Sequence, residues 1–328
     1  MNIVKLRDFK EYNLLYEMWN KELGFIFPIT KKLFEKNVFS YGDKVLDSSF
    51  VCLINNQPVG FIIGKIWEKD YDLPTYEKSG WISLIYVMPG FRNQGIGSKL
   101  LNLVEEIFEK QNKEVINLGR DYFNFFPGLP TDLKYYRDWF SKRGYTLGYD
   151  TNDLVKHVTV DTKKEMLKPF KDGKNYQIRR ANINDLSKID VLIKNNWPGR
   201  WHIEFLDYVE KGGTGYEYMI CIDELENVVG FCKFCDYNTP TILTSYSLNF
   251  HGRFEKIGGI GPLGVDINYR RRNIANNILK SIINELIDKG VADIIIDWTN
   301  LMHIYRNYGF EIWKSYTYTQ KEIICQNK

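Results

Sequence analysis

The feature that most constrains this chain of 328 residues is that its second half repeats the landmarks of its first. An apolar hairpin pattern around Gly60 returns around Gly230, and an aromatic motif ending at Gly144 returns at Gly309. The two pairs lie 170 and 165 residues apart and keep the same order. Self-similarity at a roughly fixed period is typical of a repeated structural unit. The sequence therefore predicts two copies of one domain.

Each copy begins with a strand pattern, continues through a hairpin, and then carries a β-branched strand followed by an amphipathic helix. This order of elements predicts the α/β fold class, with a mixed sheet flanked by helices. Polar, turn-forming residues separate the copies and predict a linker at residues 161–174. The predicted domains are therefore residues 1–160 and residues 175–328.

The passage from strand to helix carries the clearest chemical signal. In the first copy the strand ends at Val87, and the helix begins at Ile96 and runs to about Lys110. Unpaired amides and the positive dipole end at a helix start favour phosphate groups, and glycines let the backbone approach them. Glycines at such a position also occur as plain turn chemistry, but the recurrence in the second copy favours a pyrophosphate site, to which Arg92 adds a positive charge.

These residues resemble the signature of the GNAT (Gcn5-related N-acetyltransferase) family. That signature is [Q/R]-x-x-G-x-[G/A] after a strand end, followed by a late Y-x-x-x-G-[F/Y] motif. Both halves show both parts, and the chain resembles bacterial tandem GNAT proteins. The resemblance implies that backbone amides hold the pyrophosphate of acetyl-CoA, which acts as co-substrate, while the adjoining strand separates from its neighbour to admit pantetheine. Carried over by position, it implicates the following cofactor-binding residues: Ile85, Tyr86, Val87, Arg92, Asn93, Gln94, Gly95, Ile96, Gly97 and Ser98 in the first copy, and Val265, Arg270, Arg271, Arg272, Asn273, Ile274 and Ala275 in the second.

The second copy departs from the signature at one position. Asn273 stands where the family has glycine, although Ala275 fits the pattern. Asparagine tolerates left-handed backbone better than most residues, but it adds a side chain near the phosphates. The three arginines at 270–272 either compensate by their charge or form a solvated cluster, and the sequence leaves both interpretations open.

Acetyl transfer from a thioester to an amine requires a neutral amine, a stabilised oxyanion and a protonated thiolate. The resemblance assigns thiolate protonation to the tyrosine four residues before the late glycine, which is Tyr305 in the second copy. The first copy has Phe140 there, so Tyr135, Tyr136 or Tyr122 are its alternatives. Tyr305 also fits a packing role, and no general base is evident.

The predicted function is an N-acetyltransferase that moves acetyl from acetyl-CoA to an amine of a small molecule or peptide by direct attack. One alternative is a non-catalytic acyl-CoA-binding or sensing protein. A second is a tRNA-dependent aminoacyl ligase, which also uses two fused domains of this kind. The formal net charge of +3, without long runs of one sign, argues against a nucleic-acid partner.

The remaining composition predicts a cytoplasmic protein with no membrane partner and no metal, acting as a monomer or a homodimer. The charged start is unlike a signal peptide, and no apolar run approaches the ~20 residues of a membrane span. Cys232 and Cys235 have a zinc-like spacing but lie in a strand pattern that points them to opposite faces. An odd count of scattered cysteines indicates reduced thiols: Cys52, Cys221, Cys232, Cys235 and Cys325.

Overall fold

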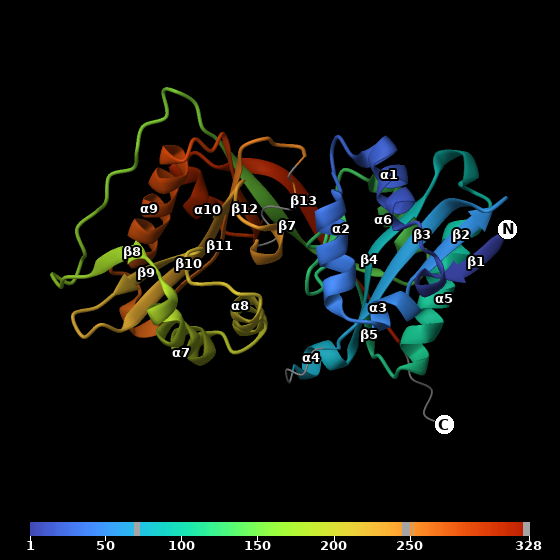
Figure 1. The fold of residues 1–328 in the computed structure, drawn as a ribbon, viewed down its shortest axis with the longest axis horizontal. Helices are drawn as coiled ribbons and strands as arrows, with labels where there is room; N and C mark the ends of the chain where they lie inside the picture. The colour runs from blue at the N-terminus through green and yellow to red at the C-terminus, as the bar shows by residue number, and fades with distance from the viewer. Residues whose placement is uncertain (69–72, 245–249, 251, 324–328) are drawn as a thin grey trace. The chain divides into compact units, whose positions relative to one another are not determined.

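The computed structural model describes residues 1–68, 73–244, 250 and 252–323. The chain forms two compact units (Figure 1). Unit 1 contains Met1–Asn152 together with Trp313–Lys328, and unit 2 contains Asp153–Ile312. The α/β class predicted from the sequence is confirmed, whereas the predicted domain limits stay a prediction. The compact units differ from those limits at the C-terminal strand, which belongs to unit 1.

Unit 1 is a mixed sheet in the strand order β1-β2-β3-β4-β5-β13-β7, with β6 paired to β13. Its strands are β1 Asn2–Lys5, β2 Phe50–Ile54, β3 Gln57–Ile66, β4 Ser79–Val87, β5 Val115–Leu118, β6 Leu129–Pro130, the first part of β7 Thr146–His157 and most of β13 Glu311–Glu322. Its helices are α1 Tyr12–Leu23, α2 Lys31–Val38, α3 Lys44–Asp47, α4 Pro74–Glu77, α5 Ile96–Lys110 and α6 Lys134–Ser141, with short 3-10 turns at Leu6–Asp8, Phe39–Tyr41 and Pro89–Phe91.

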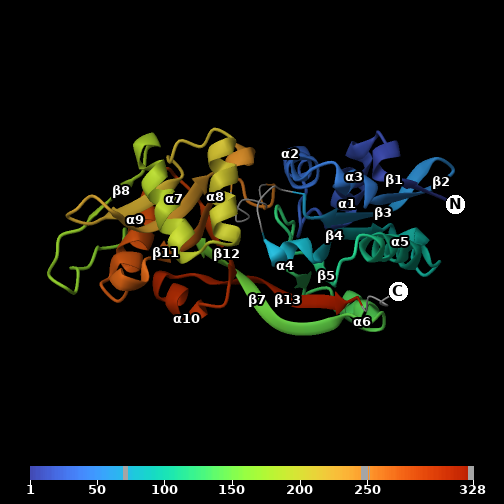
Figure 2. The same ribbon diagram turned by 90° about the horizontal axis from the view of Figure 1, so that it is seen from below.

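Helices α1 and α5 cover opposite faces of the unit 1 sheet (Figure 2). The apolar stripe of α5 packs on one face, where a side-chain carbon on Gly80 would come within 2.6 Å of the Phe108 ring. The helix therefore requires a glycine on the strand beneath it. On the other face, the α1 residue Trp19 contacts the ring of Tyr86 on β4 at a centroid distance of 5.8 Å.

Unit 2 repeats this plan in the strand order β7-β12-β11-β10-β9-β8. Successive side chains of β10 alternate between two cores, so that Phe231 faces α7 and α8 whereas Cys232 faces α9. The strands are β8 Gln177–Arg180, β9 Tyr218–Ile222, β10 Val228–Asp236, β11 Ile257–Val265 and β12 Asp293–Thr299. The helices are α7 Leu186–Asn196, α8 Arg200–Glu210, α9 Ile274–Asp288 and α10 Met302–Tyr305, with 3-10 turns at Ile183–Asp185, Thr241–Leu243, Ile267–Tyr269 and Arg306–Tyr308.

The segment predicted as a linker packs along α9. The side chain of Asn277 bonds both the amide and the carbonyl of Lys168, at 2.9 and 2.8 Å. Asn284 does the same to Glu165, at 2.7 and 2.9 Å. These paired amide bonds satisfy the backbone of an extended segment that has no strand partner of its own.

Four of the five cysteines are buried free thiols, and Cys325 lies outside the described residues. No helix in the described ranges is both long and apolar enough to cross a membrane. The predicted cytoplasmic location stays a prediction.

Strand β13 completes the unit 1 sheet. Gln320 pairs with Asn117 on β5, and Tyr316 pairs with Pro130 on β6. Tyr316 is fully buried and its ring stacks on Phe126 at a centroid distance of 6.2 Å. The C-terminal strand therefore supports the loop that carries Phe126.

Replacing Tyr316 by alanine is expected to lower the free energy of unfolding by about 3 kcal/mol, because a large buried side chain leaves a cavity. Urea denaturation measures the change. Ile312→Ala is the control, since Ile312 lies on the same strand with 46% of its surface exposed. Equal stability of the two variants would contradict the role given to β13.

Candidate functional site

Strand β4 separates from β5 halfway along its length. It pairs with β3 from Gly80 to Val87, but its parallel pairing with β5 ends at Ile82, opposite Leu118. In the described part of the chain β5 itself ends there, so the last five residues of β4 extend beyond it. The resemblance to GNAT proteins implies such a separation.

The separation leaves backbone amides facing an open gap. Met88 donates its amide to the Val59 carbonyl on β3 at 2.9 Å. The backbone groups of successive strand residues point to alternate sides of the strand. The backbone amide of Tyr86 therefore also points toward β3, and the backbone amides of Ile85 and Val87 point into the gap. These two residues are among those predicted from the sequence.

A β-bulge marks the point where the strands part. Ile63 on β3 lies opposite Leu84, and the next residue, Gly64, lies opposite Ile82. Ser83 is therefore an extra residue in β4. A bulge of this kind sets two successive side chains on the same face, so Ser83 and Leu84 both face the side of α1.

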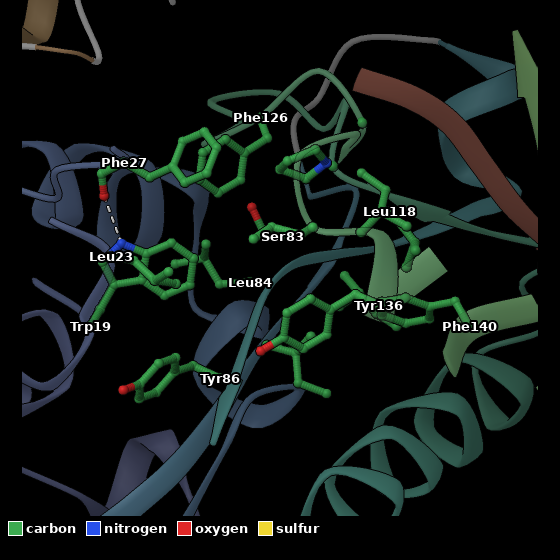
Figure 3. Close-up of a pocket in the computed structure, with 17 residues that line it drawn as sticks. Trp19, Leu23, Phe27, Ser83, Leu84, Tyr86, Leu118, Phe126, Tyr136 and Phe140 are labelled. Carbon is green, nitrogen blue, oxygen red and sulfur yellow. Dashed lines mark hydrogen bonds between the residues drawn. The ribbon is translucent and has the colours of Figure 1, made fainter. Parts of the chain in front are cut away.

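A pocket opens between this stretch of β4, helix α1 and helix α6, with an empty volume of about 640 Å³ that includes space open to solvent. Figure 3 shows the Ser83 hydroxyl and the rings of Phe27 and Phe126 turned toward it. Its described lining residues include no Asp, Glu, Lys, Arg or His. The pocket is thus an apolar cavity lined by aliphatic and aromatic side chains with a few hydroxyl groups.

Two tyrosines of the pocket differ in their partners. Tyr86 donates its hydroxyl to Glu22 at 2.8 Å, and burial followed by that bond raises its pKa. Burial also raises the pKa of Tyr136, whose hydroxyl has no hydrogen-bond partner among the described residues. Tyr136 is therefore a protonated phenol with a proton free to donate.

The structure separates the three alternatives that the sequence left for the first copy. Phe140 and Tyr136 both line the pocket, one helical turn apart on α6. Tyr135 is 62% exposed and donates to the Asn93 side chain at 3.3 Å. Tyr122 is buried against Trp67, with a ring-centroid distance of 5.9 Å. Of the three, only Tyr136 lines the pocket.

The loop predicted to bind phosphate leads directly into the first turn of α5. Gly95 is its left-handed N-cap residue, with φ +80°, and a side-chain carbon there would meet nothing within 4 Å. The first helical bond runs from the Lys99 amide to the Gly95 carbonyl at 3.0 Å, so the amides of Ile96, Gly97 and Ser98 precede the helical ladder.

The side chains of this loop are mostly engaged within unit 1. Arg92 donates to the Val87 carbonyl at 2.8 Å and to Glu22 at 2.6 Å, so it ties the strand end to α1. Gln94 donates to the Gly90 carbonyl at 3.2 Å. The phosphate contact predicted for Arg92 therefore competes with an existing ion pair, and the backbone amides that precede the helical ladder are the stronger feature of the loop.

Arg143 is a cation near the helix start that sequence reasoning missed. It donates to Ser98 Oγ at 2.7 Å and lies 3.8 Å from the Trp139 ring. The motif Arg143-Gly144 was visible in the sequence, but its distance from the loop along the chain hid the contact.

Unit 2 has the same strand geometry. The pairing of β11 with β12 ends at Ile260, opposite Ile296, and the Asp266 amide donates to the Val229 carbonyl at 3.0 Å. The same alternation turns the backbone groups of Leu263 and Val265 toward the gap. The predicted residue Val265 therefore corresponds to Val87 of unit 1.

The loop of unit 2 differs in its cap. Asn273 takes the left-handed conformation with φ +71°, and its side chain donates to the Pro169 carbonyl of the linker at 2.8 Å. Arg270 donates to the Val265 carbonyl at 3.1 Å, and Arg272 pairs with Asp172 at 2.8 Å. Arg271 has positive φ, and Ile274 and Ala275 form the first turn of α9. Two of the three arginines are thus held by other groups.

The unit 2 gap has a carboxyl group beside its strand, whereas the described lining residues of the unit 1 pocket include no Asp or Glu. Asp297 follows β12 residue Ile296, and its Oδ1 lies 3.2 Å from where a side-chain carbon of Gly261 would be. Burial, aided by the nearby charges of Asp153 and Glu204, raises the pKa of Asp297 to about 8. Tyr305 is 8% exposed, and burial raises its pKa.

Comparisons with known proteins agree with this geometry. A profile described as Acetyltransferase (GNAT) family matches residues 12–126, and one described as Acetyltransferase (GNAT) domain matches residues 239–313. Two such domains define an acyltransferase of tandem architecture. The chain belongs to the GNAT acetyltransferase family, and its domains imply an acetyl-CoA-dependent acyltransferase. The predictions of family and enzyme class are confirmed.

Solved structures share the fold. A glucosamine N-acetyltransferase region of a fungal multi-domain GH3 β-N-acetylglucosaminidase matches 97% of this chain with TM-score 0.82 and 21% identity. The chain spans 38% of the length of that protein. A tandem GNAT protein from the clavulanic acid biosynthesis pathway matches 98% of both chains with TM-score 0.64 and 11% identity. A GNAT protein from Sphaerobacter thermophilus matches 84% of this chain and 80% of its own, with TM-score 0.60 and 14% identity. No curated protein matches the sequence.

Among the described residues, no group of three or more His, Cys, Asp or Glu side chains is arranged to hold a metal ion. The sequence-based expectation that no metal is involved stays a prediction.

The raised pKa of Asp297 predicts a pH-dependent stability of unit 2. The ordinary pKa of an Asp side chain is 3.8, and that of Asp297 in the folded protein is about 8. Between these two pH values, Asp297 holds a proton in the folded protein that it has released in the unfolded chain. Its contribution to stability therefore falls as the pH rises from about 4 to about 8. Asp297→Asn should remove this dependence, so the variant gains in urea midpoint over the wild type between pH 5 and pH 8.

Asp161→Asn is the control for this measurement, because Asp161 lies exposed in the linker. A parallel pH dependence of wild type and Asp297→Asn would contradict the prediction.

Proposed function

We propose that unit 1 binds acetyl-CoA and transfers its acetyl group to a primary amine by direct attack. The observation that carries the proposal is the continuity of three features: the open left-handed loop at Gly95, the amides of Ile85 and Val87 in the gap, and the pocket beyond the Ser83 bulge. This order matches the order of the groups along acetyl-CoA, from the pyrophosphate through pantetheine to the acetyl group that meets the acceptor. The loop takes the pyrophosphate, the gap takes pantetheine, and the pocket takes the acceptor.

The chemistry is assigned to backbone groups and one phenol. The Ile85 amide donates to the thioester oxygen as it becomes an oxyanion, since a fixed donor in a water-poor gap stabilises developing charge. Tyr136 donates its proton to the departing thiolate, because it is the phenol of α6 that lines the pocket and burial favours its protonated form. The amine adds to the thioester carbon and its surplus proton leaves to solvent. The C–S bond of the tetrahedral adduct then breaks, and the Tyr136 phenolate regains a proton from solvent.

The pocket favours an uncharged acceptor with a flat apolar face. Trp19, Phe27 and Phe126 present rings, and no charged side chain is among the described lining residues. Such rings pack on the faces of sugars or of aromatic amines. Since the fungal region with a similar fold is described as a glucosamine N-acetyltransferase, glucosamine is the first acceptor that we propose to test.

Unit 2 is the second candidate for catalysis. Tyr305 has the position that the resemblance assigns to the acid, and it lies near Asp297 at the corresponding gap. Its loop differs by Asn273, whose side chain is held by the linker. We therefore propose tighter acetyl-CoA binding in unit 1.

Gly97→Asp is expected to weaken acetyl-CoA binding by at least tenfold, because it sets a negative charge among the amides that face the phosphates. A loss of 1.4 kcal/mol corresponds to that factor. Isothermal calorimetry measures the affinity and the number of sites. The fold is expected to persist, since an acidic residue in a first helical turn is favourable.

Ala275→Asp is the matched control, because Ala275 is the counterpart of Gly97 in α9. Unchanged binding is expected for it. If only Ala275→Asp loses acetyl-CoA binding, the cofactor site is in unit 2. If calorimetry detects no binding of acetyl-CoA to the wild type, the proposal is wrong.

Tyr136→Phe is expected to lower kcat about 100-fold, within the range for loss of a general acid. The Kd for acetyl-CoA should stay within twofold, because the phenol acts on the leaving group. Release of free CoA thiol, followed with a thiol reagent and glucosamine as acceptor, measures the rate. Tyr305→Phe should change it little, and the opposite pattern would assign catalysis to unit 2.

A further inference from the structure

We propose that Ser83 orients the acceptor amine by accepting a hydrogen bond from it, and that the buried pair Lys65–Asp121 fixes the Ser83 hydroxyl for that task. The proposal rests on the proposed function of unit 1, and it names the group that recognises the nucleophile.

The bulge in β4 places Ser83 at the meeting point of the two substrates. Its side chain lies on the face of Leu84, which is the side of α1, and it lines the pocket while 4% exposed. Two residues further along the strand, the Ile85 amide faces the gap assigned to the thioester. Without the extra residue in β4, the side chain at position 83 would not share a face with Leu84.

The direction of the hydroxyl follows from its partner. Ser83 Oγ lies 3.1 Å from both Asp121 oxygens, and Asp121 is also paired with Lys65. Neither Lys65 nor Asp121 has any exposed side-chain surface, and Lys65 donates to the Phe123 carbonyl at 3.0 Å. An ionised carboxylate only accepts, so Ser83 donates its proton to Asp121. The Ser83 oxygen then presents only lone pairs to the pocket.

A hydrogen-bond acceptor at this position suits a neutral amine. The amine gives one N–H to Ser83, and this bond turns the nitrogen lone pair toward the thioester carbon. Ser83 does not remove the proton. Protonating Asp121 would leave the Lys65 ammonium buried without its counter-ion, which is costly. The buried pair therefore keeps the polarity of the hydroxyl fixed throughout the reaction.

Unit 2 lacks this arrangement. The residue at the corresponding bulge is Gly261, which has no side chain, and the carboxyl group of Asp297 lies beside it. The strands of the two units separate at corresponding residues, but the polar group beside the separation is a serine hydroxyl in unit 1 and an aspartic acid carboxyl group in unit 2.

The test compares Ser83→Ala with Ser83→Thr and with Ser79→Ala in the full chain. Ser79 is the matched control, because it is a buried serine on the same strand whose hydroxyl donates to Thr75 away from the pocket. The probes are acetyl-CoA with glucosamine, benzylamine and tyramine. Ser83→Ala is expected to lower kcat/KM about tenfold for the amine that the wild type acetylates. The KM for acetyl-CoA should stay within twofold of the wild-type value. Ser83→Thr should recover most of the loss.

A second variant tests the buried pair. Lys65→Met combined with Asp121→Leu removes both charges together, so that no unpaired ion remains. It should reproduce the tenfold loss toward the amine while acetyl-CoA binding is retained. Because Ser83 is then free to donate its proton, the loss is expected even though the hydroxyl is still present.

The outcomes separate this inference from the proposed function. Absence of acetyl-CoA binding by the wild type overturns the proposed function itself. Binding without turnover of any of the three amines overturns the orienting role, and so does a Ser83→Ala variant with unchanged kcat/KM. An equal loss toward acetyl-CoA and amine, or a loss equal to that in Ser79→Ala, would mark Ser83 as a packing residue.

Discussion

The parting of two parallel strands is the constraint on which the site depends. Strand β4 loses β5 as a partner after Ile82 while it stays paired with β3 as far as Val87. Buried backbone groups without partners are costly, so the open edge is a place where a ligand's polar groups are needed. The amides of Ile85 and Val87 are therefore a local cost to the fold, and they are the groups that we propose bind the thioester chain.

The two units share this constraint and differ in what surrounds it. Unit 1 combines an unobstructed glycine loop, a phenol at Tyr136 and an aromatic pocket. Unit 2 combines an asparagine cap tied to the linker with the buried carboxyl group of Asp297, whose pKa is raised to about 8. A duplicated domain in which one copy has an open glycine loop and the other has internal contacts at the same position allows the copies to serve different tasks on the same backbone design.

Local sequence signals predicted much of this arrangement because they arise from neighbouring residues. The helix predicted from Ile96 to Lys110 has those bounds in the structure. Its apolar stripe and the turn at Gly95 are short-range features. The sequence left the candidate acid of unit 1 open among three tyrosines, because only the packing of α6 shows that Tyr136, and neither Tyr135 nor Tyr122, lines the pocket. The linker was predicted as polar and turn-forming, but its docking on α9 needs the Asn277 and Asn284 side chains opposite it.

The sequence by itself determined the repeat, the α/β class, the family and the strand–loop–helix passage, since each is encoded in periodicity or in a short motif. Only the tertiary structure decided that β13 completes unit 1, that Ser83 occupies a bulge, and that Lys65 and Asp121 meet behind it. Strand register, bulges and ion pairs between residues 56 positions apart depend on how separate elements pack. No local pattern records such contacts, because their free energy comes from neighbours that only the folded chain brings together.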